Sequence, residues 1–338
     1  MKKSVILGAL AIFGLAAGAV SAGTLEDVQA RGALNCGVSQ GLVGFAACSA
    51  NGVWEGFDVG ICRAVAAAVL GDSMAVNFIQ TTVQSRFTVL ASGEIDILSG
   101  ETTWTFSRDV DLKFEFVGVA YYDGQGFMVP RELGVSSAKD LNDAAICIQT
   151  GTTTELNLAD FFRSNNIDYQ PVLVESNAEG QRKYLAGECD VYTTDISSLA
   201  ATRATFEAPE DHVVLPETIS KEPLGPVVRH GDNDWSDIVR WTLNVMIAAE
   251  ELGVTSANVV ELSTGTNNPE INRLLGTEGE LGAILDLEAD WAQNIISSVG
   301  NYGELFETNI GENTPIGLAR GLNAQWTAGG LLYSPPFR

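Results

Sequence analysis

A candidate anion site lies in the first third of the chain, where a short apolar segment passes into small polar residues. Ile95, Ile97 and Leu98 have the length and β-branching of a buried strand. Glycine, serine and threonines follow, and the run ends at Arg108. Hydroxyls, free backbone N–H groups and a guanidinium fork are the donors that a carboxylate prefers. The stretch therefore predicts a carboxylate site, and its alternative is a polar turn with an exposed Arg108–Asp109 pair.

A second stretch of this kind follows residues 145–149, whose apolar run also predicts a strand. Thr152 and Glu155 have the spacing of a capping box, which predicts that a helix begins here. The N-terminus of a helix presents free N–H groups and a partial positive charge, so it favours a bound anion. An ordinary helix cap without a ligand is the alternative.

The two candidate sites belong to segments that resemble each other. Residues 90–97, Leu-Ala-Ser-Gly-Glu-Ile-Asp-Ile, are echoed by residues 184–191, Tyr-Leu-Ala-Gly-Glu-Cys-Asp-Val. In both, a helix ends at glycine and Glu-x-Asp enters a strand that passes into threonines. The first copy reaches Arg108 and the second reaches Asp195. Because ligands of open α/β sheets bind beyond the carboxyl ends of the strands, this pairing predicts a zwitterion held between two α/β lobes.

The N-terminal part of the chain alternates strands and helices. Residues 34–38 and 76–79 are expected to be strands. A helix is expected between them, with Asp58 as its N-cap and Gly71 past its end. A short helix at 87–90 then leads into the first anion stretch. The order strand, helix, strand, helix, strand predicts a parallel sheet with helices on its faces.

One motif points to a different chemistry. Gly37 to Gly41 match the Gly-x-Ser-x-Gly pattern of a hydrolase nucleophile elbow. That motif needs a helix directly after its serine, whereas the residues that follow here lead into a loop. The partner base would have to be His212 or His230, the two histidines of the chain. We therefore interpret the segment as a loop that places Phe45 as an apolar wall of a site, with a core phenylalanine as the alternative.

Composition bounds the partners and the compartment. Residues 1–22 have the charged start, apolar core and small-residue end of a signal peptide, which predicts export and cleavage after Ala22. The formal net charge of −24 excludes nucleic acid as a partner, because phosphate binding needs clustered lysine and arginine. The length that remains suggests about two domains.

The five cysteines fit an oxidising compartment. Cys147 and Cys189 each fall in a predicted strand, and we expect them to form a disulfide. Cys36, Cys48 and Cys62 leave one thiol over, and the sequence gives only a slight preference for a Cys36–Cys62 pair. There is no Cys-x-x-Cys and no histidine-rich spacing, so we expect neither a metal site nor a cofactor.

Six stretches carry a likeness to a known family. They are residues 101–109, Glu-Thr-Thr-Trp-Thr-Phe-Ser-Arg-Asp; 149–158, Gln-Thr-Gly-Thr-Thr-Thr-Glu-Leu-Asn-Leu; 189–195, Cys-Asp-Val-Tyr-Thr-Thr-Asp; 219–228, Ile-Ser-Lys-Glu-Pro-Leu-Gly-Pro-Val-Val; 300–304; and 319–324. On these stretches the chain resembles the bacterial periplasmic amino-acid-binding proteins of ABC transporters, closest to the general L-amino-acid-binding members. The resemblance covers essentially the whole chain after the signal peptide.

The resemblance implies a two-lobed α/β fold, the periplasmic-binding-protein fold of type II. Each lobe is expected to be a mostly parallel sheet flanked by helices, and the two lobes are expected to close about hinges that contain glycine or proline. The implied bounds are 24–125 plus 224–338 for lobe one, with a helical C-terminal extension from about 265; 128–221 for lobe two; and hinges near 125–128 and 221–225.

The resemblance also implies a set of ligand-binding residues. They are Phe45, Glu101, Thr103, Arg108, Thr152, Thr153 and Asp195. In the implied arrangement Arg108 takes the α-carboxylate, helped by the threonines, and Asp195 takes the α-ammonium. Phe45 lies near the family's aromatic stacking position. Glu101 occupies a position where the family often has a small hydroxyl residue, so only its backbone is expected to contribute.

The implied function is binding rather than catalysis. A monomeric periplasmic protein would capture free L-amino acids, with broad specificity, and deliver them to the membrane permease subunits of an ABC importer. One alternative is an exported dehydratase-like enzyme on the same fold that acts on small carboxylic acids. For that chemistry Glu101 is the one candidate acid, and it has no evident partner base. A periplasmic sensor that uses the same pocket is a further alternative.

Overall fold

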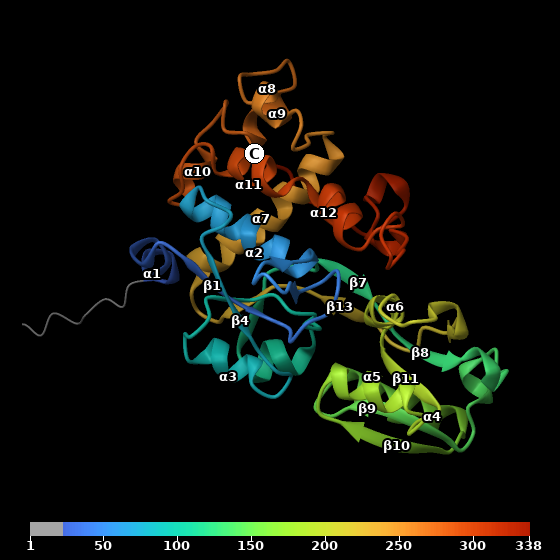
Figure 1. Ribbon diagram of the computed structural model, residues 1–338. Coiled ribbons are helices and arrows are strands. Elements are labelled where there is room, and N and C mark those ends of the chain that lie inside the picture. The colour runs from blue at the N-terminus through green and yellow to red at the C-terminus, as the bar shows by residue number, and fades with distance from the viewer. Residues whose placement is uncertain (1–22) are drawn as a thin grey trace, which may run out of the picture.

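The computed structural model describes residues 23–338, and the predicted signal peptide with its cleavage site lies outside the described residues. The described chain contains two five-stranded sheets with helices around each, followed by a cluster of further helices (Figure 1). We call the part around the first sheet the first lobe and the part around the second sheet the second lobe. None of the described helices is long and apolar enough to cross a membrane.

The first lobe is built from two separate segments of the chain. Its elements are α1 Thr24–Arg31, β1 Leu34–Val38, β2 Ala47–Cys48, β3 Trp54–Glu55, α2 Phe57–Leu70, β4 Val76–Gln80, α3 Arg86–Ala91, β5 Ile97–Leu98, the π-helical turn η1 Ser107–Asp111, β6 Phe114–Phe116, β14 Val227–Arg229 and α7 Asn233–Glu251. The strand order is β4-β1-β5-β14-β6. β1 is parallel to β4 and β5, whereas β14 is antiparallel to β5 and β6.

The second lobe repeats this plan. Its main elements are β8 Gln125–Pro130, β9 Ala144–Gln149, α4 Thr153–Asn165, β10 Tyr169–Val174, α5 Asn177–Leu185, β11 Val191–Asp195, α6 Ile196–Arg203 and β12 His212–Val214. The strand order is β10-β9-β11-β8-β12, and β8 is antiparallel to β11 and β12. Each sheet is therefore mixed: three neighbouring strands run parallel, and antiparallel strands join them where the chain enters from the other lobe.

The Glu-x-Asp repeat seen in the sequence makes the same contact in both lobes. Asp96 precedes β5, and its carboxylate accepts the backbone N–H of Asn35 in the neighbouring β1 at 2.7 Å. Asp190 precedes β11, and its carboxylate accepts the backbone N–H of Ala145 in the neighbouring β9 at 2.8 Å. The repeat thus satisfies a backbone donor at the start of the adjacent strand and sets the register of each parallel pair.

The expected helix between β1 and β4 is present, but Asp58 is not its N-cap. α2 begins at Phe57 after Gly56, and no side chain caps it. Asp58 is buried, and its carboxylate accepts the hydroxyl of Ser99 at 3.4 Å and the backbone N–H of Glu101 at 3.3 Å. The carboxylate therefore ties the helix to the loop after β5 instead of capping its own helix.

Two disulfides lie within the described residues. Cys147 in β9 is bonded to Cys189, just before β11, as the sequence predicted. Cys36 in β1 is bonded to Cys62 in α2, and Cys48 is free and exposed. Each bridge joins a central strand to the element packed beside it.

The chain crosses between the lobes twice, through two short strands that pair with each other. These are β7 Tyr121–Asp123 and β13 Glu222–Leu224, in antiparallel register. The segment before η1 joins the same pair, because the backbone N–H of Trp104 donates to the carbonyl of Pro223 at 2.8 Å. The loop that carries Arg108 is thereby fixed to a crossing strand.

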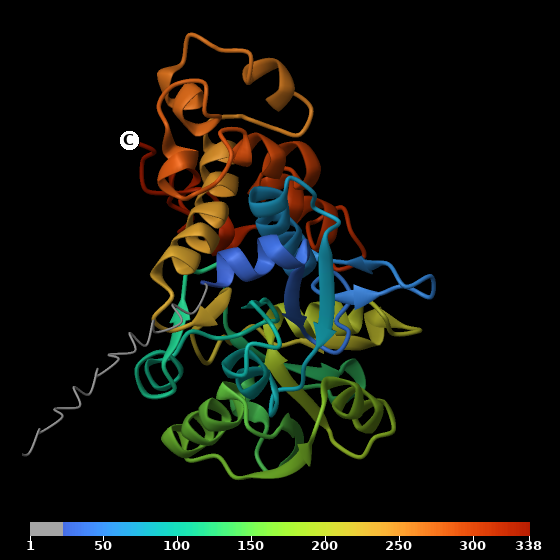
Figure 2. The ribbon, with the colours of Figure 1, turned by 90° about the vertical axis from the view of Figure 1, so that its left-hand side faces the viewer.

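The helices after α7 pack on the first lobe. They are α8 Val259–Leu262, α9 Pro269–Leu274, α10 Leu281–Ile284, α11 Trp291–Val299, α12 Tyr302–Asn309 and the 3₁₀ turns η5 Gly321–Asn323 and η6 Trp326–Ala328. α11 and α12 lie against α2 and α7 and share one apolar core with them. Both views place this extension on the side of the first lobe away from the second lobe (Figures 1 and 2).

The extension also contacts the crossing strand β7. The hydroxyl of Tyr302 donates to the carbonyl of Ala120 at 2.8 Å. The buried side-chain amide of Asn323 bonds both backbone groups of Tyr122, accepting its N–H at 2.7 Å and donating to its carbonyl at 3.1 Å. Asn323 therefore acts as a strand partner for the free edge of β7.

Asn323→Ala is expected to lower the free energy of unfolding by about 2 kcal/mol, because it leaves both backbone groups of Tyr122 without partners. Chemical denaturation measures this. The control is Asn313→Ala, since Asn313 is exposed and its side chain makes no hydrogen bond within the described chain. Equal stability of the two variants would contradict the role given to Asn323.

Candidate functional site

A cleft of about 350 Å³ lies between the two lobes. Its walls come from the loops after β1, β4 and β5 in the first lobe, and from the ends of β9 and β11 and the starts of α4, α5 and α6 in the second. The cavity is large enough for a small molecule. It lies beyond the carboxyl ends of the parallel strands, where ligands of α/β sheets bind.

The structure brings most of the predicted site residues to this cleft. Its lining includes Glu101, Thr103, Arg108, Thr152, Thr153 and Asp195. Phe45 is not among the lining residues: its side chain is fully buried and packs against the rings of Phe57 and Tyr121, with centroids 6.3 and 5.8 Å away. From the same loop Leu42 lines the cleft instead. Phe45 is thus a core residue, which the sequence analysis gave as the alternative to a wall of the site.

Arg108 is a buried cation with few partners. Its side chain extends from η1, and one guanidinium nitrogen donates to the carbonyl of Thr103 at 2.8 Å. The guanidinium carbon lies 5.5 Å from the centroid of the Phe87 ring. Burial lowers the pKa of Arg108, and the nearby carboxylates of Glu222 and Asp195 oppose that shift. The remaining donors of the fork are available to an anion.

Asp195 faces the cleft from the second lobe. It ends β11 at the N-cap position of α6, yet its carboxylate does not cap that helix and accepts no hydrogen bond from any described residue. Only 8% of the residue is exposed. Burial raises the pKa of Asp195 well above its usual range, and the acids Asp123, Glu222 and Glu101 raise it further. A bound cation would relieve that cost by stabilising the charged form.

The threonines connect the two walls of the cleft. The hydroxyls of Thr103 and Thr153 lie 3.4 Å apart across the lobes, and the Thr153 hydroxyl donates to the Glu222 carboxylate at 2.9 Å. Thr152 is the N-cap of α4 and accepts the backbone N–H of Glu155 at 3.2 Å, as its spacing predicted. Thr152 therefore starts the helix and lines the cleft.

A second buried arginine lines the cleft, and sequence reasoning missed it. Arg86 begins α3, is 7% exposed, and has no carboxylate within ion-pair distance among the described residues. Within the described chain its side chain makes one hydrogen bond, to the hydroxyl of Thr102 at 3.4 Å, and its Nε has no partner. Burial lowers its pKa to about 9, and the charge of Arg108 contributes. Its place just after the end of β4 was the available signal, because strand ends point to the site.

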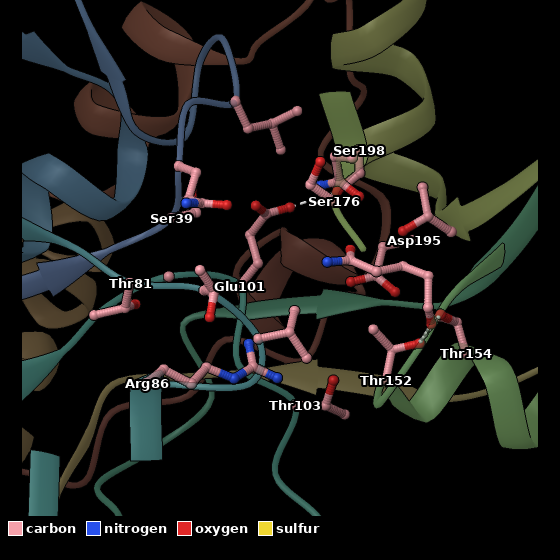
Figure 3. A pocket seen from close by; sticks show the side chains of 18 of the residues that line it. Ser39, Thr81, Arg86, Glu101, Thr103, Thr152, Thr154, Ser176, Asp195 and Ser198 are labelled. Atoms are coloured by element: carbon pink, nitrogen blue, oxygen red, sulfur yellow. Dashed lines mark hydrogen bonds between the residues drawn. The ribbon is translucent and has the colours of Figure 1, made fainter. Parts of the chain in front are cut away.

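The side chain of Glu101 lies in the cleft lining. Its φ of 45° is unusual for a residue other than glycine, and such backbone strain concentrates at functional sites. Its carboxylate accepts the hydroxyl of Ser198, which lies in α6 of the other lobe (Figure 3). Burial raises the pKa of Glu101 to about 8, and the adjacent carboxyl of Asp58, whose own pKa is raised to about 7, adds to the shift.

Comparison with known proteins agrees with this geometry. Residues 34–258 match the bacterial extracellular solute-binding proteins, family 3. The chain belongs to this family.

Three known proteins are similar to this solute-binding protein over nearly its full length. It is 62% identical to the glutamate/glutamine/aspartate/asparagine-binding protein BztA of Rhodobacter capsulatus, over 100% of both chains. It is 54% identical to the general L-amino acid-binding periplasmic protein AapJ of Rhizobium johnstonii, again over 100% of both. A solved structure of an ABC transporter periplasmic binding protein from Brucella ovis, with glutathione bound, is 53% identical, with a TM-score of 0.92 over 94% of this chain and 100% of that one. The family and the type II fold predicted from the sequence are confirmed.

Within the described residues, the hydrolase motif has neither the helix nor the histidine that its chemistry requires. Ser39 lines the cleft, but a loop and not a helix follows it. Neither histidine lines the cleft: the ring of His212 is hydrogen-bonded to the Tyr184 hydroxyl at 2.8 Å, and His230 lies beside Glu115. Within residues 23–338, no cluster of acidic, histidine or cysteine side chains has the arrangement of a metal site.

The raised pKa of Glu101 makes stability depend on pH. A carboxyl with a raised pKa binds its proton more tightly in the folded state than in the unfolded state. The stabilisation of the folded state that results is complete below the unfolded pKa of 4.5 and is lost as the pH rises to about 8. Between about pH 5 and pH 8 the wild-type unfolding free energy should therefore fall more than that of Glu101→Gln, by roughly 1 kcal/mol or more. Denaturant titrations at both pH values test this, with the exposed Glu132→Gln as control. If the unfolding free energies of Glu101→Gln and wild type fell equally between these pH values, the raised pKa of Glu101 would be contradicted.

Proposed function

We propose that this solute-binding protein captures a free L-amino acid between its lobes, with the α-carboxylate on Arg108 and the α-ammonium on Asp195. One observation carries the proposal: two buried side chains of opposite charge, one from each lobe, face the same cavity and lack full partners within the described chain. A zwitterion neutralises both at once. Because an unpaired buried charge is costly, the ligand stabilises the closed arrangement.

The neighbouring groups support this orientation. Arg108 can present a bidentate fork to a carboxylate, which is the strong geometry for this pair. The Thr103 hydroxyl and the N-terminus of α4 at Thr152 and Thr153 face the same part of the cleft and add donors for an anion. The free carboxylate of Asp195 lies on the second-lobe wall, opposite Arg108, where it would accept hydrogen bonds from an ammonium group.

Arg86 is proposed to bind an oxygen of the ligand side chain. Its guanidinium is buried in the cleft wall without a carboxylate partner among the described residues. It would therefore favour ligands whose side chain ends in a carboxylate or an amide. The named ligands of BztA, which are glutamate, glutamine, aspartate and asparagine, agree with this preference. The name of AapJ, a general L-amino acid-binding protein, supports a broad range around it.

The remaining parts of the proposal concern transport. The lobes, at about residues 24–125 plus 224–338 and 128–221, would close about the crossing strands β7 and β13. β13 falls within the expected hinge at 221–225, whereas β7 lies just before the expected hinge at 125–128, which begins β8. The protein would be exported by its signal peptide, act as a monomer in the periplasm and deliver its ligand to the permease subunits of an ABC importer. AapJ is a periplasmic amino acid-binding protein and the similar Brucella ovis protein is a periplasmic binding protein of an ABC transporter, which supports this assignment.

Binding without turnover is proposed over the dehydratase alternative. Glu101 is a buried carboxyl with a pKa raised to about 8, so it has the character of a general acid. A dehydratase also needs a base on the opposite side of its substrate. No histidine lines the cleft, and the carboxylate across from Glu101, that of Asp195, is the partner proposed for the ligand's ammonium group. Recovery of unchanged ligand by NMR after long incubation is the result expected, and appearance of a keto or unsaturated product would reverse the choice.

Arg108→Ala and Asp195→Ala are each expected to weaken amino-acid binding by about 2–5 kcal/mol, because each leaves one pole of the ligand buried without a partner. Calorimetric titration measures this after a thermal-shift screen of L- and D-amino acids and glutathione has found the best ligand. The controls are Arg163→Ala and Asp160→Ala, an exposed ion pair on α4 outside the cleft. Affinities near the wild-type value in both cleft variants would refute the assignment.

A further inference from the structure

We infer that Glu101 lets one cleft accept both acidic and amide amino acids, because its carboxyl is protonated in the complex with an acidic ligand and ionised in the complex with an amide ligand. The inference rests on the proposed function, since it assumes that the cleft binds amino acids. It gives a role to the side chain of Glu101, whereas the sequence analysis expected only the backbone of this residue to contribute to binding.

The geometry places the Glu101 carboxyl where it can respond to the ligand. One oxygen accepts the Ser198 hydroxyl from the opposite lobe, and the other oxygen has no hydrogen-bond partner within residues 23–338. Figure 3 shows Glu101 projecting into the cavity, with Arg86 on the same wall and Asp195 across from it. The free oxygen is therefore available to a group of the ligand.

The groups around Glu101 favour a proton on it. Glu101 interacts electrostatically with the following titratable groups: Asp58 of α2, Arg86 of α3, Asp123 of β7, and Tyr192 and Asp195 of β11. Three of these are carboxyls, and one is a cation. Burial and the charges of Asp58 and Asp123 raise the pKa of Glu101 to about 8, while Ser198 and Arg86 oppose the shift.

Charge balance then distinguishes the two ligand classes. Two guanidiniums, Arg86 and Arg108, and two carboxyls, Glu101 and Asp195, line the cavity. With both carboxyls ionised, the lining matches a ligand of zero net charge, such as glutamine. An acidic ligand brings one more negative charge into a space that excludes water, where an unbalanced charge is costly. Protonation of Glu101 removes one negative charge and restores the balance.

The two protonation states also offer the hydrogen bonds that the two ligand classes need. A protonated carboxyl has an O–H donor for the carboxylate oxygen of glutamate or aspartate. An ionised carboxyl only accepts, which suits the NH₂ group of glutamine or asparagine. Arg86 can donate to the oxygen that both classes share. A serine or threonine at this position would provide hydrogen bonds but no compensating charge.

The test is the number of protons exchanged on binding. Calorimetric titrations of the wild-type protein with L-glutamate and with L-glutamine are run at about pH 8.5 in buffers that differ in ionisation enthalpy. Uptake of about one proton is expected with glutamate and close to none with glutamine, because Glu101 is largely ionised in the empty cleft at this pH. The affinity for glutamate should fall by up to about tenfold per pH unit above pH 8, while that for glutamine holds.

Variants assign the proton to its residue. Glu101→Gln should abolish the uptake at pH 8.5, remove most of the fall in glutamate affinity above pH 8, and weaken glutamine binding. Glu94→Gln, an exposed acid outside the cleft, is the control and should behave as wild type. Equal proton uptake with both ligands, or uptake that persists in Glu101→Gln, overturns the inference. Absence of binding to any amino acid overturns the proposed function instead, and the wild-type comparison decides the inference even if Glu101→Gln fails to fold.

Discussion

One electrostatic feature organises the site: two side chains of opposite charge are buried in the cleft without full partners among the described residues. Arg108 and Asp195 each expose 8% of their surface, and neither is fully partnered within the described residues. The fold maintains this arrangement because both groups lie at strand ends that are fixed from behind. The loop before Arg108 is bonded to β13, and Asp195 joins β11 to α6. The proposed ligand, a small zwitterion between the lobes, would complete the set of charges.

The crossing strands connect this constraint to the rest of the molecule. Glu222 in β13 accepts the hydroxyl of Thr153 at 2.9 Å and the side-chain amide of Asn157 at 2.7 Å, so α4 contacts the crossing directly. Asp123 at the end of β7 accepts the backbone N–H of Ser197 at 3.3 Å, near the start of α6. The opposite edge of β7 is held by the C-terminal extension through Asn323. Movement of the lobes would therefore act on the cleft wall and the extension together.

Much of this organisation could be predicted from local sequence patterns. The strands β1, β4 and β9, the start of α4 at Thr152, and the cleft positions of Arg108 and Asp195 depend on short apolar runs, a capping signal and the rule for strand ends. These features are encoded within a few residues of the chain. The Cys147–Cys189 bridge likewise joins two predicted strands.

Other features depend on long-range contacts that no local pattern contains. α6 is buried on nearly every side, so it lacks the alternation of apolar and polar residues that marks a surface helix. Arg86 is buried beside Thr102, in the loop after β5, and the Phe87 ring. Its position after β4 points to the site, but no local pattern shows that its side chain is buried. Phe45 and Asp58 have side chains suited to a site wall and a helix cap, and the tertiary packing places them in the core and beside Glu101.

The most direct test of the account is a crystal structure of the mature protein with its best-binding L-amino acid. The account predicts one ligand molecule between the lobes, with its α-carboxylate bonded to the Arg108 guanidinium and its ammonium group bonded to the Asp195 carboxylate. A ligand bound outside this cleft, or one whose charged groups contact neither side chain, would contradict it.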